Sequence, residues 1–270
     1  MNHQALGLHW DFKPGLTYLN HGSFGAVPRQ LRQWRSALLD HIEADPVGYL
    51  TEELPLALNA ARQDLADLVV ANPAQLAFVP STSHGVNELL QRLELPVGSE
   101  LLLLDHGYNA TGNAAVYAAQ QRGWTVRQAA LPLPLSGADQ VVAAVAAAWG
   151  PHTRLLLVDH ITSPTALVLP VPELVALARD RGALVVVDGA HGPGQVPLDF
   201  AAWQSQGLEP DAYVGNLHKW LCCPRGSAFV WVRGPWQEQL RPLVLSHGAN
   251  APLGPGQSRF HVEHDWTGTF

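Results

Sequence analysis

The stretch that decides the fold runs from Ala183-Leu-Val-Val-Val187 to Arg225. Its first five residues are apolar and mostly β-branched, a pattern that is typical of a buried strand. They lead directly into Asp188-Gly-Ala-His191. A second short strand, predicted at Asp211-Ala-Tyr-Val214, leads into Gly215-Asn-Leu-His-Lys-Trp220. An acid therefore follows one predicted strand, and a lysine follows the next.

Lysine is rare in this chain. The 270 residues hold fourteen arginines but only two lysines, Lys13 and Lys219. A solvated surface lysine is the ordinary alternative, although a chain that relies on arginine for its positive charge has little need of one. Arginine stays protonated, whereas lysine can lose its proton and form a Schiff base. We therefore predict that Lys219 is a catalytic residue.

Asp188 and Lys219 complement each other chemically. Each follows a predicted strand, and ligands of open α/β sheets bind at the carboxyl ends of the strands. Pyridoxal-phosphate enzymes use a lysine for the Schiff base and an aspartate that keeps the pyridine nitrogen protonated, so that the ring can accept electrons. The pair predicts pyridoxal 5'-phosphate as the cofactor, with Lys219 in the internal aldimine and Asp188 on the ring nitrogen.

Composition excludes several other classes of protein. A net charge of −7 argues against a nucleic-acid surface, and no apolar run approaches the length of a membrane span. The adjacent Cys222 and Cys223 are too close for a relaxed disulfide, so no structural disulfide is expected and a reducing cytoplasm fits best. The first residues do not resemble a signal peptide. The thirteen histidines show no metal-ligand spacing, so no metal is predicted. Gly192-Pro-Gly194 lacks the third glycine of a dinucleotide fingerprint.

The rest of the chain alternates between predicted strands and helices. Strands are expected at 76–79, 100–104, 125–128 and 154–158, and helices at 110–121, 138–149 and 172–181. This rhythm predicts an α/β fold with a mostly parallel sheet and helices on both faces.

The two halves of the deciding stretch resemble one known family. Val185–Phe200 (VVVDGAHGPGQVPLDF) and Pro210–Val232 (PDAYVGNLHKWLCCPRGSAFVWV) resemble the class V aminotransferase family of fold-type I pyridoxal-phosphate enzymes. They are most similar to its isopenicillin N epimerase-like branch, and the resemblance extends from Tyr18 to the C-terminus. It implies the three-layer αβα large domain of fold-type I enzymes and an amino-acid substrate.

A strand-to-helix junction at Pro80-Ser-Thr-Ser-His84 offers a phosphate site, with a helix expected to begin near His84. Hydroxyl side chains and free backbone N–H groups at a helix N-terminus bind phosphate, although ordinary Ser/Thr helix caps are far commoner. The resemblance places Thr82, Ser83 and His84 in the phosphate-binding cup of the family.

Further residues are expected around the cofactor ring. Tyr108 follows a strand and offers an aromatic face for stacking, although it could instead pack on the next helix. By resemblance, four more residues contact the cofactor, namely Ser163 and His191 near the ring oxygen and Asn216 and His218 near the phosphate. His160 could simply satisfy a hydrogen bond in the core, and the two cysteines match packing positions.

Both ends of the chain carry further family segments. Tyr18-Leu-Asn-His-Gly-Ser-Phe-Gly25 reads physically as an N-terminal arm, and the resemblance places it on the substrate side, with contacts from Asn20, His21, Gly22 and Ser23. Trp266-Thr-Gly-Thr269 resembles a segment whose threonine reaches the phosphate of the neighbouring subunit. This implies a homodimer with shared active sites, in which Thr269 binds the cofactor of the partner.

The domain boundaries follow from the same resemblance. We expect residues 1–25 to form the arm and residues 26–270 to form the cofactor-binding large domain. Relatives continue into a small C-terminal domain that carries the arginine for the substrate carboxylate, and we expect that domain to be absent from these 270 residues.

The predicted reaction is chemistry at the α-carbon of an amino acid, with Lys219 moving the α-proton. The branch resemblance favours epimerase, racemase or C–S lyase activity, and cysteine desulfurase-like or aminotransferase activity is the alternative. No cysteine matches the persulfide-forming cysteine of the desulfurases. An alternative of another class is an inactive remnant that still binds the cofactor.

Overall fold

A seven-stranded sheet forms the centre of the protein. The computed structural model describes residues 9–237 and residue 240. The strand order is β1-β7-β6-β5-β4-β2-β3, and β7 alone runs antiparallel to its neighbours. The strands are β1 (Leu76–Val79), β2 (Glu100–Leu104), β3 (Thr125–Ala129), β4 (Thr153–Asp159), β5 (Leu184–Asp188), β6 (Ala212–Asn216) and β7 (Ala228–Val232). The prediction of a mostly parallel sheet is therefore confirmed.

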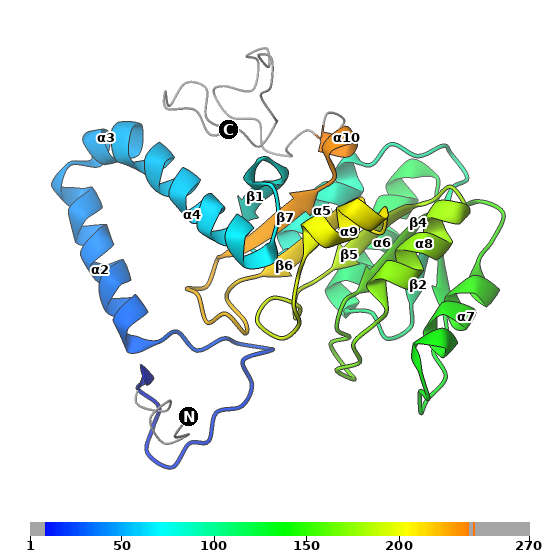
Figure 1. Cartoon of the computed structure of the whole chain (residues 1–270), viewed down its shortest axis with the longest axis horizontal. Coiled ribbons are helices and arrows are strands. Elements are labelled where there is room, and N and C mark those ends of the chain that lie inside the picture. Colours follow the sequence, from blue (N-terminus) through cyan, green and yellow to red (C-terminus); the bar gives the residue numbers. More distant parts are fainter. Residues whose placement is uncertain (1–8, 238–239, 241–270) are drawn as a thin grey trace.

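Helices cover both faces of this sheet (Figure 1). The central strands are apolar runs because a parallel sheet buried on both faces has no solvent side. On β4, Leu156 and Val158 join the core of one face, while Leu155 and Leu157 join the core of the other. The first core contains residues of α4 (Leu54–Val69), α7 (Ala138–Ala148), α8 (Val171–Asp180) and α9 (Phe200–Gln206), and the second contains residues of α5 (Thr82–Arg92), α6 (Asn109–Arg122) and α10 (Gly234–Gln237). The predicted three-layer αβα architecture is confirmed.

Local sequence determines where the helices near the sheet edge begin and end. α5 begins at Thr82, two residues before the predicted start, because Oγ of Ser81 accepts a hydrogen bond from the backbone N–H of His84 at 3.1 Å. α6 ends at Gly123, which adopts a left-handed φ of 67° that favours glycine. Ser81 thus fixes the end of the loop that precedes α5, and Gly123 fixes the turn between α6 and β3.

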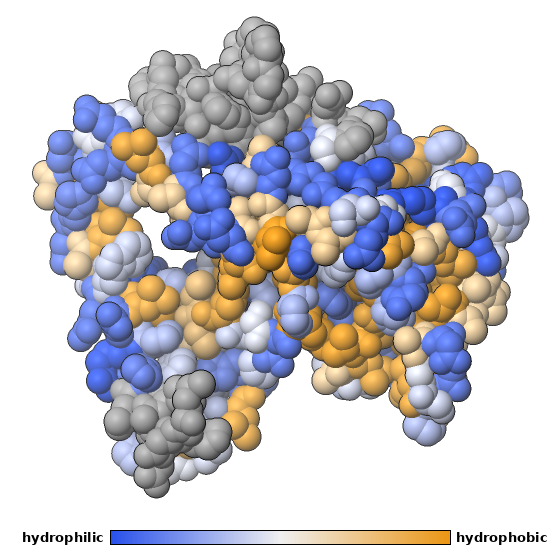
Figure 2. Space-filling view, in the orientation of Figure 1, coloured by the Kyte–Doolittle hydropathy of each residue, from blue (hydrophilic) through white to orange (hydrophobic). Residues whose placement is uncertain are grey.

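A bent helical arm precedes the sheet in the chain. It consists of α2 (Arg29–Ala44), the short α3 (Pro46–Gly48), the π-helical turn η2 (Tyr49–Glu53) and α4. In Figure 1, α2 stands away from the sheet, and none of its residues is buried. Trp34 and Leu39 on α2 are exposed, and apolar residues are visible among the polar ones along the arm in Figure 2.

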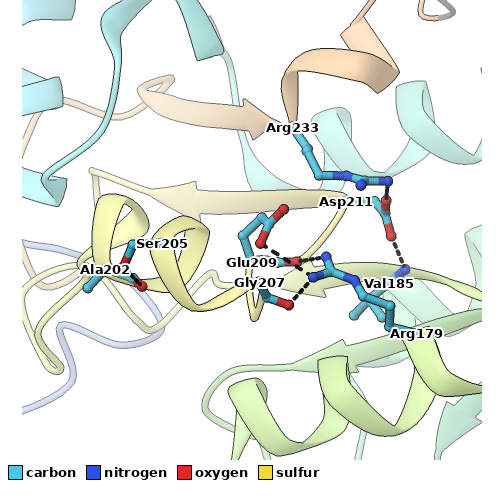
Figure 3. A network of polar contacts seen from close by, with 8 residues as sticks. All are labelled: Arg179, Val185, Ala202, Ser205, Gly207, Glu209, Asp211 and Arg233. Atoms are coloured by element: carbon cyan, nitrogen blue, oxygen red, sulfur yellow. Dashed lines mark hydrogen bonds and ion pairs between the residues drawn. The ribbon is translucent and has the colours of Figure 1, made fainter.

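A polar network ties three elements together at the amino end of β5 and β6 (Figure 3). Oδ2 of the buried Asp211 accepts a hydrogen bond from the N–H of Val185 at 2.8 Å, and its other oxygen pairs with Arg233. Arg179 of α8 donates to the carbonyl oxygen of Glu209 at 2.8 Å. The network holds β5, β6 and the end of β7 in register at the edge opposite the candidate site.

The described residues set three further bounds. No helix among them is long and apolar enough to cross a membrane. Residues 9–237 and 240 also contain no group of three His, Cys, Asp or Glu side chains that could hold a metal ion. Cys222 and Cys223 are free thiols.

Candidate active site

The carboxyl ends of the central parallel strands bring the acidic and amide side chains of the site together. Asp159, Asp188 and Asn216 are the last residues of β4, β5 and β6. Asp159 pairs with Asp188 in the strand register, and all three side chains are buried. The loop after β2, which carries Tyr108, ends at the same edge. The topology therefore assembles a polar cluster from four strands.

Asp188 is held in place by two hydrogen-bond donors. Its Oδ2 accepts from the hydroxyl of Thr111 at 2.6 Å, and its Oδ1 accepts from the N–H of Ala190 at 3.1 Å. The side chain is almost completely buried, at 2% exposure. Hydrogen bonds to the charged form favour an ionised carboxylate in such a place. Asp188 is therefore suited to bind a cationic ring nitrogen.

Lys219 lies in the loop after β6, within electrostatic reach of this carboxylate. Its Nζ lies 2.8 Å from Nε2 of His191 and 5.9 Å from the ring centroid of Tyr108. Burial lowers the pKa of Lys219, while the negative charges of Asp188 and Asp159 oppose the shift. A lysine with a lowered pKa has more of the neutral amine that forms a Schiff base.

The N-terminus of α5 has the features of an anion site. The N–H of Thr82 donates to Oδ1 of Asn216 at 2.9 Å, which joins α5 to the end of β6. The hydroxyl of Thr82 is buried and has no hydrogen-bond partner among the described residues. Such an orphan is expected where a ligand supplies the missing acceptor. Ser83 is half-buried, whereas His84 is exposed and its ring lies 3.8 Å from Glu88.

Two other residues predicted to contact the cofactor, His218 and Ser163, lie in the loops after β6 and β4. Nδ1 of His218 faces the carbonyl oxygen of Ser227 at 2.8 Å, and burial lowers the pKa of His218. Ser163 is exposed in the loop after β4, while the neighbouring Thr162 is buried and accepts from the N–H of Leu167 at 2.8 Å. His160 is buried against the hydroxyl of Tyr213 at 3.0 Å, which is the core role considered from the sequence.

The N-terminal segment packs against the lysine loop. The carbonyl oxygen of Gly22 lies 3.0 Å from Nε2 of His191, and Nδ1 of His21 lies 3.4 Å from Sγ of Cys222. The ring of His21 also lies 6.0 Å from the ring of Trp220. Asn20 and Ser23 are exposed in the turn that carries this contact. Four residues predicted on the substrate side therefore lie in a segment that touches the loop of Lys219.

Two residues of the site, Thr111 and Asp159, are not predicted by the sequence, and the structure does not describe one residue that is predicted. Thr111 pairs with an acid 77 positions away, and its only sequence signal is its place three residues after Tyr108. Asp159 ends its strand just as Asp188 does, and this parallel was a usable signal. Thr269 lies outside the described residues.

The site as a whole fits one cofactor. A buried carboxylate, a nearby lysine and a helix N-terminus with an orphaned hydroxyl suit, respectively, the ring nitrogen, the aldehyde and the phosphate of pyridoxal phosphate. With this strand order, they define the large-domain fold of the fold-type I pyridoxal-phosphate enzymes. The chain belongs to the class-V aminotransferase family, whose model matches residues 30–254.

Individual relatives agree with this assignment. The chain is 40% identical to an isopenicillin N epimerase of Amycolatopsis lactamdurans over 87% of this chain and 58% of the relative. It is 35% identical to an isopenicillin N epimerase of Streptomyces clavuligerus over 90% of this chain and 60% of the relative. The chain thus spans somewhat less than two thirds of the length of these relatives. A solved cystine C–S lyase in complex with cysteine persulfide matches with a TM-score of 0.79 and 25% identity, over 94% of this chain and 67% of that one.

Proposed function

We propose that this chain binds pyridoxal 5'-phosphate through Lys219 and acts at the α-carbon of an amino acid, with epimerisation or racemisation as the reaction. The observation that carries the proposal is the placement of Lys219, with its lowered pKa, beside the buried and doubly hydrogen-bonded Asp188. The likeness to two isopenicillin N epimerases supports the choice of reaction.

The chain's own residues have distinct tasks in this proposal. Asp188 holds the ring nitrogen, and the N-terminus of α5 with Thr82, Ser83 and His84 holds the phosphate, with Asn216 and His218 behind it. Tyr108 would cover one face of the ring, and His191 and Ser163 would be placed toward the ring oxygen. When bound, the cofactor supplies a sink for electrons left at the α-carbon. Lys219 Nζ would take the α-proton from one face of the α-carbon, and inversion requires that a proton then be delivered to the opposite face.

C–S bond cleavage is the second candidate, because the cystine C–S lyase has the same fold with a TM-score of 0.79. The free thiols of this chain argue against cysteine desulfurase-like activity, in which a cysteine of the enzyme takes up the sulfur as a persulfide. Burial raises the pKa of Cys222 and of Cys223, and a thiol with a raised pKa is a poor nucleophile at neutral pH.

A panel of amino acids in deuterated water tests the reaction. We expect deuterium at the α-carbon and interconversion of configuration, without sulfide or keto acid. Sulfide release would favour C–S cleavage, and keto acid would favour transamination. Lys219→Arg is the matched control and should abolish every product. If no amino acid exchanges its α-proton or yields a product, the chain is a cofactor-binding remnant and the proposal fails.

We also propose that the protein is a homodimer with shared active sites. In the helical arm, no residue of α2 is buried, and Trp34 and Leu39 are exposed. A second copy of the chain would cover these apolar side chains. Thr269 is proposed to reach the phosphate of the partner. Sedimentation should show a dimer that Trp34→Glu weakens, while Val97→Glu, at an exposed loop position, leaves it intact. A strictly monomeric protein that binds the cofactor tightly would contradict the shared site.

Two expectations about context complete the proposal. We place the protein in the cytoplasm, because two free adjacent cysteines suit a reducing compartment. We also keep residues 1–25 as the substrate-side arm and residues 26–270 as the large domain. The contact between Gly22 and His191 supports the first assignment.

A further inference from the structure

Two carboxylates end neighbouring strands at the centre of the site. Asp159 and Asp188 are paired in the parallel register of β4 and β5, where adjacent strands lie about 4.8 Å apart. Two residues earlier on each strand, Leu157 and Val186 share the core between the sheet and helices α5 and α6. Since side chains alternate along a strand, both aspartates lie on that same face. Their carboxyl groups are therefore close neighbours.

The two acids differ in their hydrogen bonds. Asp188 accepts from Thr111 and from Ala190, one donor for each oxygen. Asp159 receives a hydrogen bond from the backbone of Tyr108, and its Oδ2 is buried with no partner among the described residues. Donors stabilise the ionised form, so the negative charge of the pair belongs on Asp188. An unpartnered oxygen suits a protonated carboxyl group.

The electrostatics of the pair agree with this assignment. Burial, and then the neighbouring charge of Asp188, raise the pKa of Asp159 to about 8, against the opposing effects of the Tyr108 N–H and Lys219. Two close buried carboxyl groups do not both ionise readily, and they titrate as a pair. Asp159 also borders a cavity of about 290 Å³, which Tyr108 and Thr111 help to line.

Other titratable groups belong to the elements around β4. They are Asp188 and His191 from β5 and its loop, Tyr213 and Lys219 from β6 and its loop, Asp105, His106 and Tyr108 from the loop after β2, and His160 next in the chain. Among these groups, Asp188 and Lys219 are the charges that act on Asp159. Lys219 is thus the group that responds when Asp159 ionises.

We propose that Asp159 is a positioning residue that stays protonated at neutral pH and limits the pair to a single negative charge, carried by Asp188. The single negative charge on Asp188 matches the single positive charge of a protonated ring nitrogen. This match with the cofactor rests on the proposed function. The protonation itself is a property of the chain alone. Ionisation of Asp159 above neutral pH places a second negative charge beside Lys219 and favours the protonated form of its amine.

Infrared spectroscopy of the full chain, labelled with carbon-13 aspartate and free of cofactor, tests the protonation directly. We expect a band from a protonated aspartic acid at pH 7 that disappears as the pH rises through about 8. The band should be lost in Asp159→Asn. It should be kept in the matched control Asp105→Asn, because Asp105 lies in the loop after the adjacent strand β2, where its carboxylate accepts a hydrogen bond from the N–H of Leu131. No such band in the wild type at pH 7, or its survival in Asp159→Asn, would overturn the proposal.

Lysine acylation gives the second readout and does not depend on the cofactor. At pH 9, Lys219 should react about tenfold faster in Asp159→Asn than in the wild type, because the second negative charge is missing, and the rates should agree at pH 7. Lys13, the other lysine of the chain, is the internal reference. Equal rates at pH 9 would overturn the positioning role. If the wild-type chain does not bind pyridoxal phosphate, the proposed function is refuted. The infrared and acylation results would still stand, because neither depends on the cofactor.

Discussion

Nζ of Lys219 lies 2.8 Å from Nε2 of His191. The same imidazole lies 3.2 Å from the carbonyl oxygen of Ile161 through Nδ1 and 3.0 Å from that of Gly22 through Nε2. Burial lowers the pKa of His191, and the charge of Lys219 lowers it further, so the ring is neutral at neutral pH. A neutral imidazole has a single N–H, so a proton on Nδ1 donates to Ile161 and leaves Nε2 to accept from Lys219, whereas a hydrogen bond to the Gly22 oxygen needs that proton on Nε2. One side chain thus connects the lysine loop, the loop after β4 and the N-terminal segment.

Gly25 allows the N-terminal segment to reach this position. A Cβ atom at residue 25 would lie 2.0 Å from the carbonyl oxygen of His218 and 2.6 Å from that of Lys219. Both are backbone atoms that cannot turn away, so Gly25→Ala should displace the segment at a cost of about 1–3 kcal/mol. Hydrogen exchange should show lost protection in residues 20–26.

Gly112→Ala is the matched control for that experiment. Gly112 lies inside α6, and nothing stands within 4 Å of its added Cβ. The substitution should stabilise the helix by up to about 1 kcal/mol and leave exchange in residues 20–26 unchanged. Unchanged exchange in both variants would mean that the segment does not rest on the lysine loop.

Thr111 should matter for cofactor binding although it was not foreseen. Thr111→Val removes the hydroxyl that donates to Oδ2 of Asp188 at 2.6 Å and keeps a similar shape. Hydrogen bonds to charged groups contribute about 1.5–3 kcal/mol, so the dissociation constant of pyridoxal phosphate should rise about tenfold or more. Thr111→Ser keeps the hydroxyl and should bind like the wild type. Equal affinity in the valine variant would show that this bond does not prepare Asp188.

We expect the buried His160 to make the protein less stable in acid. Burial lowers the pKa of His160 to about 4, whereas the unfolded chain takes up that proton near the ordinary value of 6.5. The unfolded state therefore binds more protons between these values, and the free energy of unfolding falls as the pH drops from 6.5 to about 4. The full effect is about 3 kcal/mol.

Denaturant unfolding across that pH range measures the contribution of His160. His160→Gln should remove its share of the pH dependence, and the difference between the two curves isolates it from other groups. His152→Gln, at an exposed position, serves as the control and should follow the wild type. Parallel curves for the wild type and His160→Gln would show that His160 is not held neutral by burial.

The sheet and its catalytic edge could be predicted because their signals are local. Continuous apolar runs predict buried strands, and the scarcity of lysine singles out Lys219. Thr111 could not be found in this way, because its bond to Asp188 exists only after α6 packs on the sheet. The predicted start of α5 near His84 is two residues late, because Ser81 caps the helix and lets it begin at Thr82. The packing role expected for the cysteines describes Cys223, which packs on the core, better than Cys222, which lies beside His21.

The central claim is that Lys219 holds the cofactor, and the presence of only two lysines makes one measurement decisive. The chain is incubated with pyridoxal phosphate, reduced with borohydride and digested, and the peptides are weighed by mass spectrometry. The account predicts a stable adduct on the peptide with Lys219, an unmodified Lys13, and loss of both the adduct and the reducible absorbance in Lys219→Arg. An adduct on Lys13, an adduct that persists in Lys219→Arg, or none in the wild type would contradict it.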